Sequence, residues 1–427
     1  MSSPTDSPRI LTPQRKQLEL RTFDLDATLP DDHRARAIWT VVERLDLAAF
    51  YDRIQSRGEN AGRPATDPRI LLALWLYATA EGIGSARQLE RLCSSDDAYR
   101  WICGGVSVNY HTLSDFRVDH ESLLDDLMTQ VLGAMIRQGL VTMTCVAQDG
   151  TRVRADAGAA SFRREAALAD LQQQARLQIE RLKQELADDP GAHARLERTA
   201  RERAARERAD AIERALSEMP AVAEVKRRNR GKKGKKQTEP RVSTTDPEAR
   251  VMKMADGGFR PAFNVQLATD VDSRVIVGVA VTNSGSDLSM LVPMLDDMRR
   301  RTGLDPGEIL VDGGYVTLAS LQAAHQRGIT TYAPVKTTAP KSPSGCIYNR
   351  TDAPAIALWR SRMQRPDAKA IYRQRAATAE TVNADLRRWR TLDRFPVRGL
   401  RKARCHALLN AMAYNALRWT ELADPRA

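Results

Sequence analysis

Residues 141–150 have the sequence VTMTCVAQDG and mark a change in the pattern of the 427-residue chain. Upstream of them, apolar residues recur at three- and four-residue intervals, which is typical of helices that bury one face. Here β-branched and apolar residues run together and lead into Asp149-Gly150. This run predicts a strand over 141–148 that ends in a carboxylate, so the fold contains a sheet as well as helices.

The sheet signals resume after residue 260. Two alternating runs, FNVQLATDV at 263–271 and RVIVGVAVT at 274–282, flank Asp272-Ser273 and predict a hairpin. Further strands are expected at 308–311 and 330–334, with helices at 286–301, 317–327, 367–389 and 401–422. This order predicts an α/β fold in which a mixed sheet carries helices on its faces.

The chain before residue 139 is expected to be helical. Capping and turn residues predict helices that begin near Pro68, Ser85 and Asn109, and the stretch 123–136 predicts one more. Short helices with tight turns are compatible with a helix-turn-helix that docks on DNA, and equally with any small helical bundle. Residues 1–30 are rich in Pro, Ser, Thr and charge and are expected to form a flexible lead-in.

Residues 161–249 separate the first strand from the rest of the sheet. Leucine and alanine recur at helical spacing on both sides of Asp189-Pro190-Gly191, which predicts an inserted, charged helical hairpin of coiled-coil type. The segment KRRNRGKKGKK at 226–236 follows. It is expected to be a basic loop that lacks order when no partner is bound.

Positive charge is concentrated in two segments. The formal net charge is +12, of which residues 226–236 contribute +8 and residues 387–404 contribute +7, leaving the rest of the chain at −3. A polyanion is therefore a natural partner for these two segments, and nucleic acid is the commonest one. The alternative, a solvated basic loop and an ordinary charged helix, is not excluded by charge alone.

The cysteines and the apolar stretches argue against two other classes of protein. Five cysteines are spread without the spacing of a disulfide framework or a zinc site: Cys93, Cys103, Cys145, Cys346 and Cys405. The longest strongly apolar stretch, Ile70 to Ala80, spans 11 residues and is too short to cross a bilayer. The first residues lack the apolar middle of a secretory signal, so we expect no membrane partner and a reducing cytoplasm.

Three acidic residues are candidates for metal-dependent phosphodiester chemistry. Asp149 and Asp312 each follow a predicted strand, and Glu380 lies on a late predicted helix that could cross the sheet. Converging carboxylates can hold two divalent ions, and magnesium and manganese prefer such oxygen ligands. Taken singly, each Asp is better explained as a turn residue before Gly, and Glu380 as an exposed helix residue; the order and context of all three favour the catalytic interpretation.

The surroundings of these acids resemble a known family. The segments VAQDGTRVRADAG and ILVDGGY, the C-terminal stretch YRQRAATAETVNADLRRWRTLDRFPVRGL and the helical segment DPRILLALWLYATAEGIGSARQLERLC resemble insertion-sequence DDE transposases of the IS-four-like superfamily. The resemblance covers about residues 35–160 and 250–420. It implies a ribonuclease-H-like catalytic domain formed by residues 139–160 and 250–422, with a DNA-binding domain at 31–138 and the insertion at 161–249.

The resemblance also implies roles for individual residues. Asp149, Asp312 and Glu380 would be the catalytic metal ligands for two magnesium or manganese ions. The family places a Tyr and an Arg before the Glu and a basic residue seven positions after it, which Tyr372, Arg375 and Arg387 match. These three would contact DNA phosphates. Four residues separate Arg375 from Glu380, where the best-known form of the motif has three, and Arg387 stands where Lys is usual.

The implied activity is cleavage of DNA at the ends of a mobile element, followed by attack of the freed 3′ hydroxyl on target DNA. Double-stranded DNA, as terminal inverted repeats and as target, is the expected partner of a homodimer in the bacterial nucleoid. The basic residues expected to neutralise phosphates include Lys226, Arg227, Arg228, Lys232 and Lys233. The alternatives are a metal-dependent nuclease without strand transfer, a non-catalytic DNA-binding protein derived from a transposase, and a coiled-coil scaffold.

Overall fold

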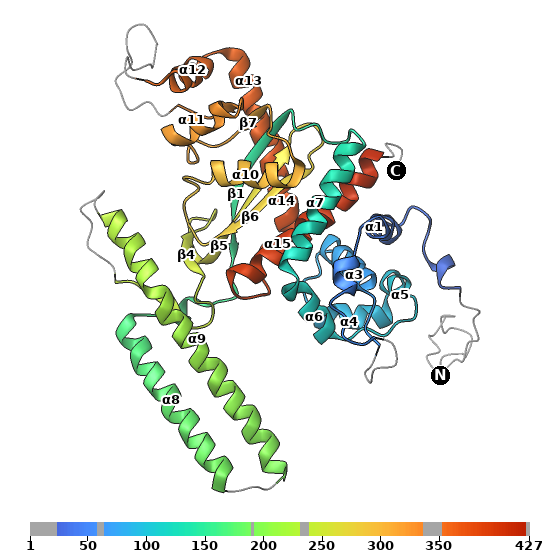
Figure 1. Ribbon diagram of the computed structural model, residues 1–427, viewed down its shortest axis with the longest axis vertical. Coiled ribbons are helices and arrows are strands. Elements are labelled where there is room, and N and C mark those ends of the chain that lie inside the picture. The colour runs from blue at the N-terminus through green and yellow to red at the C-terminus, as the bar shows by residue number, and fades with distance from the viewer. Residues whose placement is uncertain (1–23, 58–63, 189–191, 231–238, 336–351, 424–427) are drawn as a thin grey trace, which may run out of the picture.

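The computed structural model describes residues 24–57, 64–188, 192–230, 239–335 and 352–423 (Figure 1). A mixed sheet lies at the centre, with the N-terminal helices on one side of the view and a long helical hairpin projecting on the other. Among the described residues, no helix combines the length and the apolar character needed to span a bilayer.

The N-terminal region is helical, as the sequence predicts. Its helices are α1 (Arg34–Glu43), α2 (Ala48–Tyr51), α3 (Pro68–Ala80), α4 (Ala86–Ser95), α5 (Asp97–Cys103), α6 (Tyr110–Asp119) and α7 (Glu121–Arg137), after a 3₁₀ turn at Asp26–Thr28. The predicted starts are confirmed because Asp67, Ser85 and Asn109 accept hydrogen bonds from the first free backbone N–H groups of α3, α4 and α6. Of the predicted lead-in, residues 1–23 lie outside the described residues.

The central sheet contains both parallel and antiparallel pairs. Its strands are β1 (Cys145–Arg154), β4 (Arg250–Lys253), β5 (Phe259–Asp270), β6 (Ile276–Thr282), β7 (Glu308–Leu310) and β8 (Thr330–Tyr332). The order is β4-β5-β1-β7-β8, with β6 also paired to β5. Strands β1, β7 and β8 run parallel, whereas β4, β5 and β6 pair antiparallel, which confirms the predicted mixed sheet.

The first strand differs from its prediction. It begins at Cys145 rather than at residue 141 and continues past Asp149 to Arg154, so Asp149 lies inside the strand and not at its end. The reason is the long antiparallel partner β5, whose register with β1 runs from Asp270 to Ala262. Because β5 supplies backbone partners along this whole length, the polar residues after Ala147 remain extended.

The helices around the sheet follow the predicted order with shifted ends, except that the helix at Pro354–Arg362 was not predicted. They are α10 (Leu291–Thr302), α11 (Leu318–Gln326), α12 (Pro354–Arg362), α13 (Pro366–Arg375), a π-helical turn (Ala376–Glu380), α14 (Thr381–Arg388) and α15 (Leu400–Ala423). Two predictions were wrong in detail. The helix expected from residue 286 begins at Leu291, and the single helix expected at 367–389 is divided by the π-helical turn.

One continuous hydrophobic core joins the N-terminal helices to the sheet. Helix α15 packs against α7, α3 and β6. On α15, the buried Asn415 accepts a hydrogen bond from the N–H of Ile276 (2.9 Å) and donates one to its carbonyl (2.8 Å), so the helix completes the edge of β6. The Trp419 indole donates to the Gln138 side chain at 2.7 Å, just beyond α7.

A buried ionic cluster reinforces this junction. The carboxylate of Asp125 on α7 receives Arg301 of α10 at 2.5 Å and Arg404 of α15 at 2.8 Å. Arg300 of α10 contacts its second oxygen at 2.8 Å. Burial raises the pKa of Asp125, but the facing guanidinium groups lower it by more, so the net shift of this pKa is downward.

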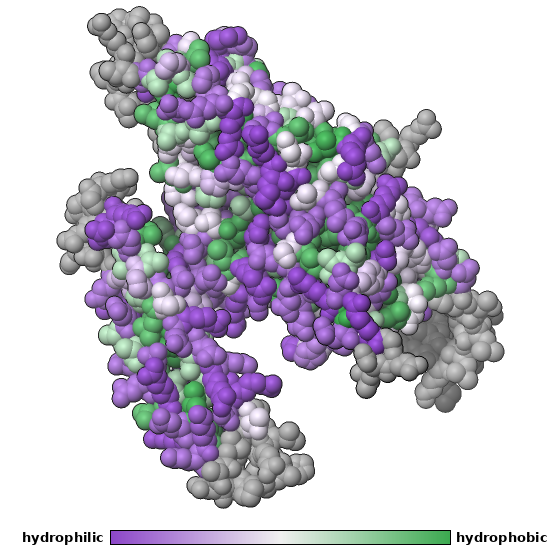
Figure 2. All heavy atoms as spheres, viewed as in Figure 1, coloured by the Kyte–Doolittle hydropathy of each residue, from purple (hydrophilic) through white to green (hydrophobic). Residues whose placement is uncertain are grey.

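The predicted hairpin is present as α8 (Glu165–Asp188) and α9 (Ala192–Arg230), which pack through a small core of their own. Figure 2 shows a mainly hydrophilic surface along it. A short ribbon, β2 (Phe162–Arg163) and β3 (Val242–Ser243), closes its root. The prediction of a basic loop from residue 226 is wrong at its start, because α9 continues to Arg230 and Glu224 pairs with Arg227 and Arg228. Lys232, Lys233 and the turn at 189–191 lie outside the described residues.

Candidate active site

Asp149 lies on β1, and Asp312 follows the end of its parallel neighbour β7. The pairing of β1 with β7 aligns Cys145 with Glu308 and Ala147 with Leu310. The paired register ends at Leu310, and Asp312 lies two residues beyond the end of β7. Burial raises the pKa of Tyr372, and the carboxylates of Asp312 and Asp149 both act in the same direction, so both acids lie near this tyrosine.

Glu380 reaches the same region through Arg375. The Arg375 guanidinium lies 3.5 Å from Asp149 Oδ1 and donates to Glu380 Oε1 at 3.1 Å. Asp149 and Glu380 are therefore no further apart than one guanidinium group can span. The Glu380 side chain remains 58% exposed, whereas that of Asp149 is 22% exposed.

The π-helical turn at Ala376–Glu380 explains how this contact forms. A π turn contains one residue more than the corresponding α-helical turn, and such turns are frequent at functional sites. The chain has one more residue between Arg375 and Glu380 than the best-known form of the motif. The π turn accommodates that residue, because Arg375 and Glu380 still meet side chain to side chain.

Two further residues from these helices contact the cluster. The Asn383 amide on α14 donates to Asp149 Oδ2 at 3.2 Å, and the hydroxyl of Tyr372 lies within hydrogen-bonding reach of Arg375. Sequence reasoning missed Asn383, although its position one helical turn after Glu380 placed it on the same helix face. Its own carbonyl oxygen Oδ1 is buried and has no partner among the described residues.

A polar network lies against Gly150, the residue that follows Asp149. The side chain of Asp287 accepts hydrogen bonds from Asn264 (2.7 Å), Gln266 (2.7 Å) and Arg152 (3.0 Å). The buried Tyr315 hydroxyl donates to Gln266 at 2.6 Å. Sequence reasoning did not single out Asp287, because a helix was expected from residue 286 and an Asp in its first turn gives no sign of burial.

Gly150 is required by this network. A Cβ atom at position 150 would lie 2.4 Å from Gln266 Nε2 and 2.7 Å from Asp287 Oδ1. Such distances are too short for non-bonded atoms, so any side chain would displace the network next to Asp149. The Asp-Gly pair in β1 therefore has a packing reason and does not mark a turn.

The charge state of Asp149 depends on its neighbours. Burial raises its pKa, and the Glu380 and Asp287 carboxylates act in the same direction, whereas Arg375 and the Gly150 N–H lower it. The net shift of the pKa is upward. Opposite charge at this position stabilises the ionised carboxylate, and in the described conformation Arg375 provides that charge.

The donor chemistry fits a hard divalent cation. Asp149, Asp312 and Glu380 offer only oxygen ligands, and the unpartnered Asn383 oxygen lies beside them. Within the described part of the chain, no group of three or more His, Cys, Asp or Glu side chains is arranged to hold a metal ion. Arg375 stands between two of the acids, so metal ligation by all three requires Arg375 to move aside and Glu380 to turn inward.

Two family models match the chain. Residues 23–119 match a transposase domain (DUF772), and residues 241–416 match the transposase DDE domain. The chain belongs to the insertion-sequence DDE transposases. No curated protein and no solved structure gives a significant match to this transposase. Asp312 and Glu380 lie within the matched DDE domain, whereas Asp149 and the helical hairpin lie in the stretch between the two matches.

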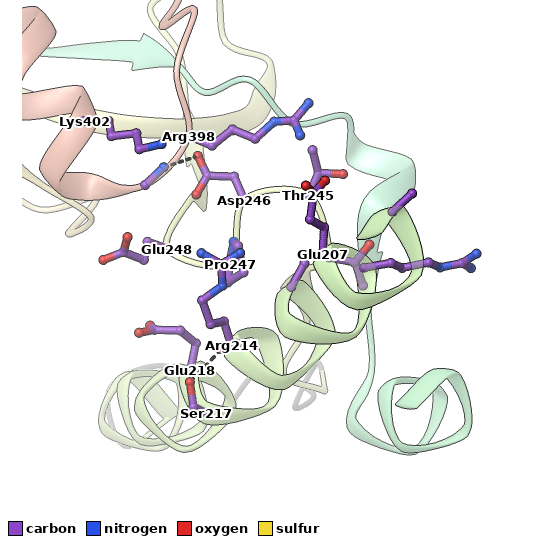
Figure 3. Close-up of a pocket in the computed structure, with 15 residues that line it drawn as sticks. Glu207, Arg214, Ser217, Glu218, Thr245, Asp246, Pro247, Glu248, Arg398 and Lys402 are labelled. Carbon is purple, nitrogen blue, oxygen red and sulfur yellow. Dashed lines mark hydrogen bonds between the residues drawn. The ribbon is translucent and has the colours of Figure 1, made fainter. Parts of the chain in front are cut away.

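A separate cavity of about 690 Å³ lies at the root of the hairpin (Figure 3). Cations and acids alternate around it, with Arg214 and Glu218 from α9 facing Asp246 and Lys402. Asp246 is fully buried, and one of its oxygens accepts the N–H of Gly399 at 3.2 Å, ahead of α15. The acids here are structural, because Glu248 accepts the N–H of Leu400 (2.9 Å) and Glu218 pairs with Arg250.

Proposed function

We propose that this transposase cleaves DNA at the ends of its mobile element and joins the freed 3′ hydroxyl to target DNA. In this proposal, Asp149, Asp312 and Glu380 hold two magnesium or manganese ions. The observation that carries the proposal is the Arg375 bridge, since it joins a strand carboxylate to a helix carboxylate from a distant part of the chain. The position of Asp312 just beyond the end of β7, the parallel neighbour of the strand that holds Asp149, supports it.

Bound divalent ions supply an activated oxygen nucleophile and stabilise the leaving oxygen in such chemistry. The residues of the chain prepare the site. Asn383 orients the Asp149 carboxylate through its amide, and Arg375, once released from the acids, binds phosphate oxygens through its planar fork. Tyr372 lies beside Arg375 and contributes a hydroxyl to the same phosphate.

The remaining roles concern DNA. We assign recognition of the terminal inverted repeats to the N-terminal helices, and contact with backbone phosphates to Arg387 and to the basic residues Lys226, Arg227, Arg228, Lys232 and Lys233. Pairing two ends requires at least two protomers, so we propose a homodimer on DNA. Glu224 neutralises part of the charge of Arg227 and Arg228 in the free protein, and DNA would compete with it.

The test is cleavage of a DNA duplex that carries an element end. We expect nicking with magnesium or manganese, none with calcium, and joining of pre-cut 3′ ends to a plasmid. Asp149→Asn, Asp312→Asn and Glu380→Gln should each abolish both reactions while DNA binding is retained. Cleavage without joining would support the nuclease instead. Full activity in all three variants would support a non-catalytic DNA-binding protein with a contaminating nuclease.

A further inference from the structure

A second, smaller cavity adjoins the candidate active site. It has a volume of about 350 Å³ and is lined by residues of β1 immediately after Asp149, by the end of β4 with the turn that follows it, and by Gly285 and Arg387. Its charged lining residues are Arg152, Lys253 and Arg387, and no acidic residue lines it. The cavity at the root of the hairpin differs in this respect, because acids line it as well.

The three cations of the smaller cavity are not equally engaged. Arg152 is held by Asp287 at 3.0 Å and by the carbonyl of Gly285 at 3.1 Å. Lys253 and Arg387 are exposed, and in the described parts of the chain neither has a carboxylate partner. The positive charge of two side chains is therefore available to a ligand from outside.

The position of the cavity indicates which anion it would take. Thr151 lines the cavity and shares the face of β1 that carries Asp149, while Arg387 lies on α14, whose Asn383 contacts Asp149. An anion held here is therefore adjacent to the reacting centre. Gly285 contributes no side chain, and a Cβ there would meet only Met252 Cγ at 3.6 Å, which leaves room beside it for a group such as a phosphate.

We infer that the cavity seats a DNA backbone phosphate next to the one that reacts, with Lys253 of β4 and Arg387 of α14 as its cationic ligands. The inference rests on the proposed function and adds Lys253, together with the hairpin of β4 and β5, to the surface that positions the DNA strand. Arg152 lines the same cavity in a structural role, because its ion pair with Asp287 fixes its orientation.

The first experiment measures the salt dependence of DNA binding in calcium, where cleavage is not expected. Each phosphate contact that is lost lowers the slope of log K against log salt by about 1. Lys253→Gln should lower the slope by that amount, and Lys253→Arg should retain the wild-type slope. Arg274→Gln is the matched control, since Arg274 is an exposed cation in the turn at the other end of β5.

A second pair of variants tests the cavity without removing a cation. A Cβ at Gly285 would meet Met252 Cγ at 3.6 Å, an ordinary contact, so a side chain is accommodated there. Gly285→Glu and Gly285→Gln have nearly the same shape and differ in charge. We expect the Glu variant to bind DNA at least fivefold more weakly than the Gln variant at low salt.

The outcomes separate this inference from the proposed function. If the wild type cleaves DNA but Lys253→Gln keeps the wild-type slope and the two Gly285 variants bind equally, the phosphate seat is wrong and the function stands. If the wild type binds DNA without cleaving it, and the slope still falls in Lys253→Gln, the seat stands and the catalytic proposal is wrong.

Discussion

The guanidinium of Arg375 lies 3.5 Å from Asp149 and at the same time 3.1 Å from Glu380. Without a metal ion, the transposase thus neutralises two of its proposed ligands with a cation of its own. The arrangement limits repulsion between the acids and defines a conformation that metal binding must replace.

Replacing Arg375 tests whether a metal ion takes over from this guanidinium as the counter-ion of the two acids. In Arg375→Gln, the two carboxylates lose their counter-ion, and we expect the metal-free protein to lose about 1–2 kcal/mol of stability, since both side chains of the Arg375–Asp149 pair are largely buried. Manganese should then raise the melting temperature of the variant more than that of the wild type. Thermal unfolding across a manganese titration measures both effects; an unchanged metal-free melting temperature would contradict the proposed counter-ion role.

Gly150→Ala should damage the site by overpacking. The new methyl group would collide with Gln266 and Asp287, which we expect to cost about 1–3 kcal/mol and to reduce cleavage strongly. Urea unfolding and the cleavage assay are the measurements. Gly158→Ala is the control, because a Cβ there meets nothing within 4 Å and should leave both readouts unchanged.

Asp125→Asn should weaken the junction between the N-terminal helices and the sheet. The substitution removes the charge that faces Arg300, Arg301 and Arg404, leaves the buried Arg301 with Asp297 as its remaining carboxylate partner, and is expected to cost about 3–5 kcal/mol. The pKa of Asp125 is lower in the folded protein than in the unfolded chain. Its contribution to the free energy of unfolding is therefore complete above the unfolded pKa and is lost as the pH falls through the folded pKa. Chemical unfolding at pH 7 and pH 3 should show the variant and the wild type converging at the lower pH. Asp126→Asn, at an exposed neighbour on α7, should behave like the wild type.

His406 makes stability depend on pH at mildly acidic values. Burial lowers the pKa of this fully buried histidine to about 4 from 6.5, and it contacts the hydroxyl and carbonyl of Thr391. The unfolded chain binds the proton at higher pH, so stability should decrease as pH falls from about 6.5 towards 4. Urea unfolding between pH 7 and pH 4.5 should show this decrease in the wild type and in His325→Gln, an exposed histidine. In His406→Gln it should be much smaller, and an equal slope in that variant would refute the assignment.

The parts of the fold that could be predicted are those governed by local sequence. The starts of α3, α4 and α6 follow from capping residues, and the hairpin follows from its apolar spacing. The extension of β1 through Asp149 could not be read locally, because its polar residues are stabilised by β5 and by Asn383. The end of α9 was misjudged for a similar reason, since Glu224 pairs with Arg227 and Arg228 within the helix.

For the candidate site, the sequence identified the acids but not their surroundings. Asp149, Asp312, Glu380, Tyr372 and Arg375 were proposed from motif and resemblance, and their involvement in catalysis stays a prediction. The extra residue before Glu380 is visible in the sequence, yet only the structure shows the π turn that contains it. The roles proposed for Asp287 and Lys253 depend on residues that are distant in sequence and close in the fold, so no pattern in the sequence could have identified them.

The position of α15 has a consequence for how such genes change over time. This helix packs on the sheet and on α1 and α3 alike, so segments that are far apart along the chain contribute to one interior. A frameshift late in the gene would expose the apolar faces of α3 and α7 as well as truncate the catalytic half. Damaged copies should therefore be cleared as misfolded polypeptides, and a domesticated descendant would have to retain the final helix.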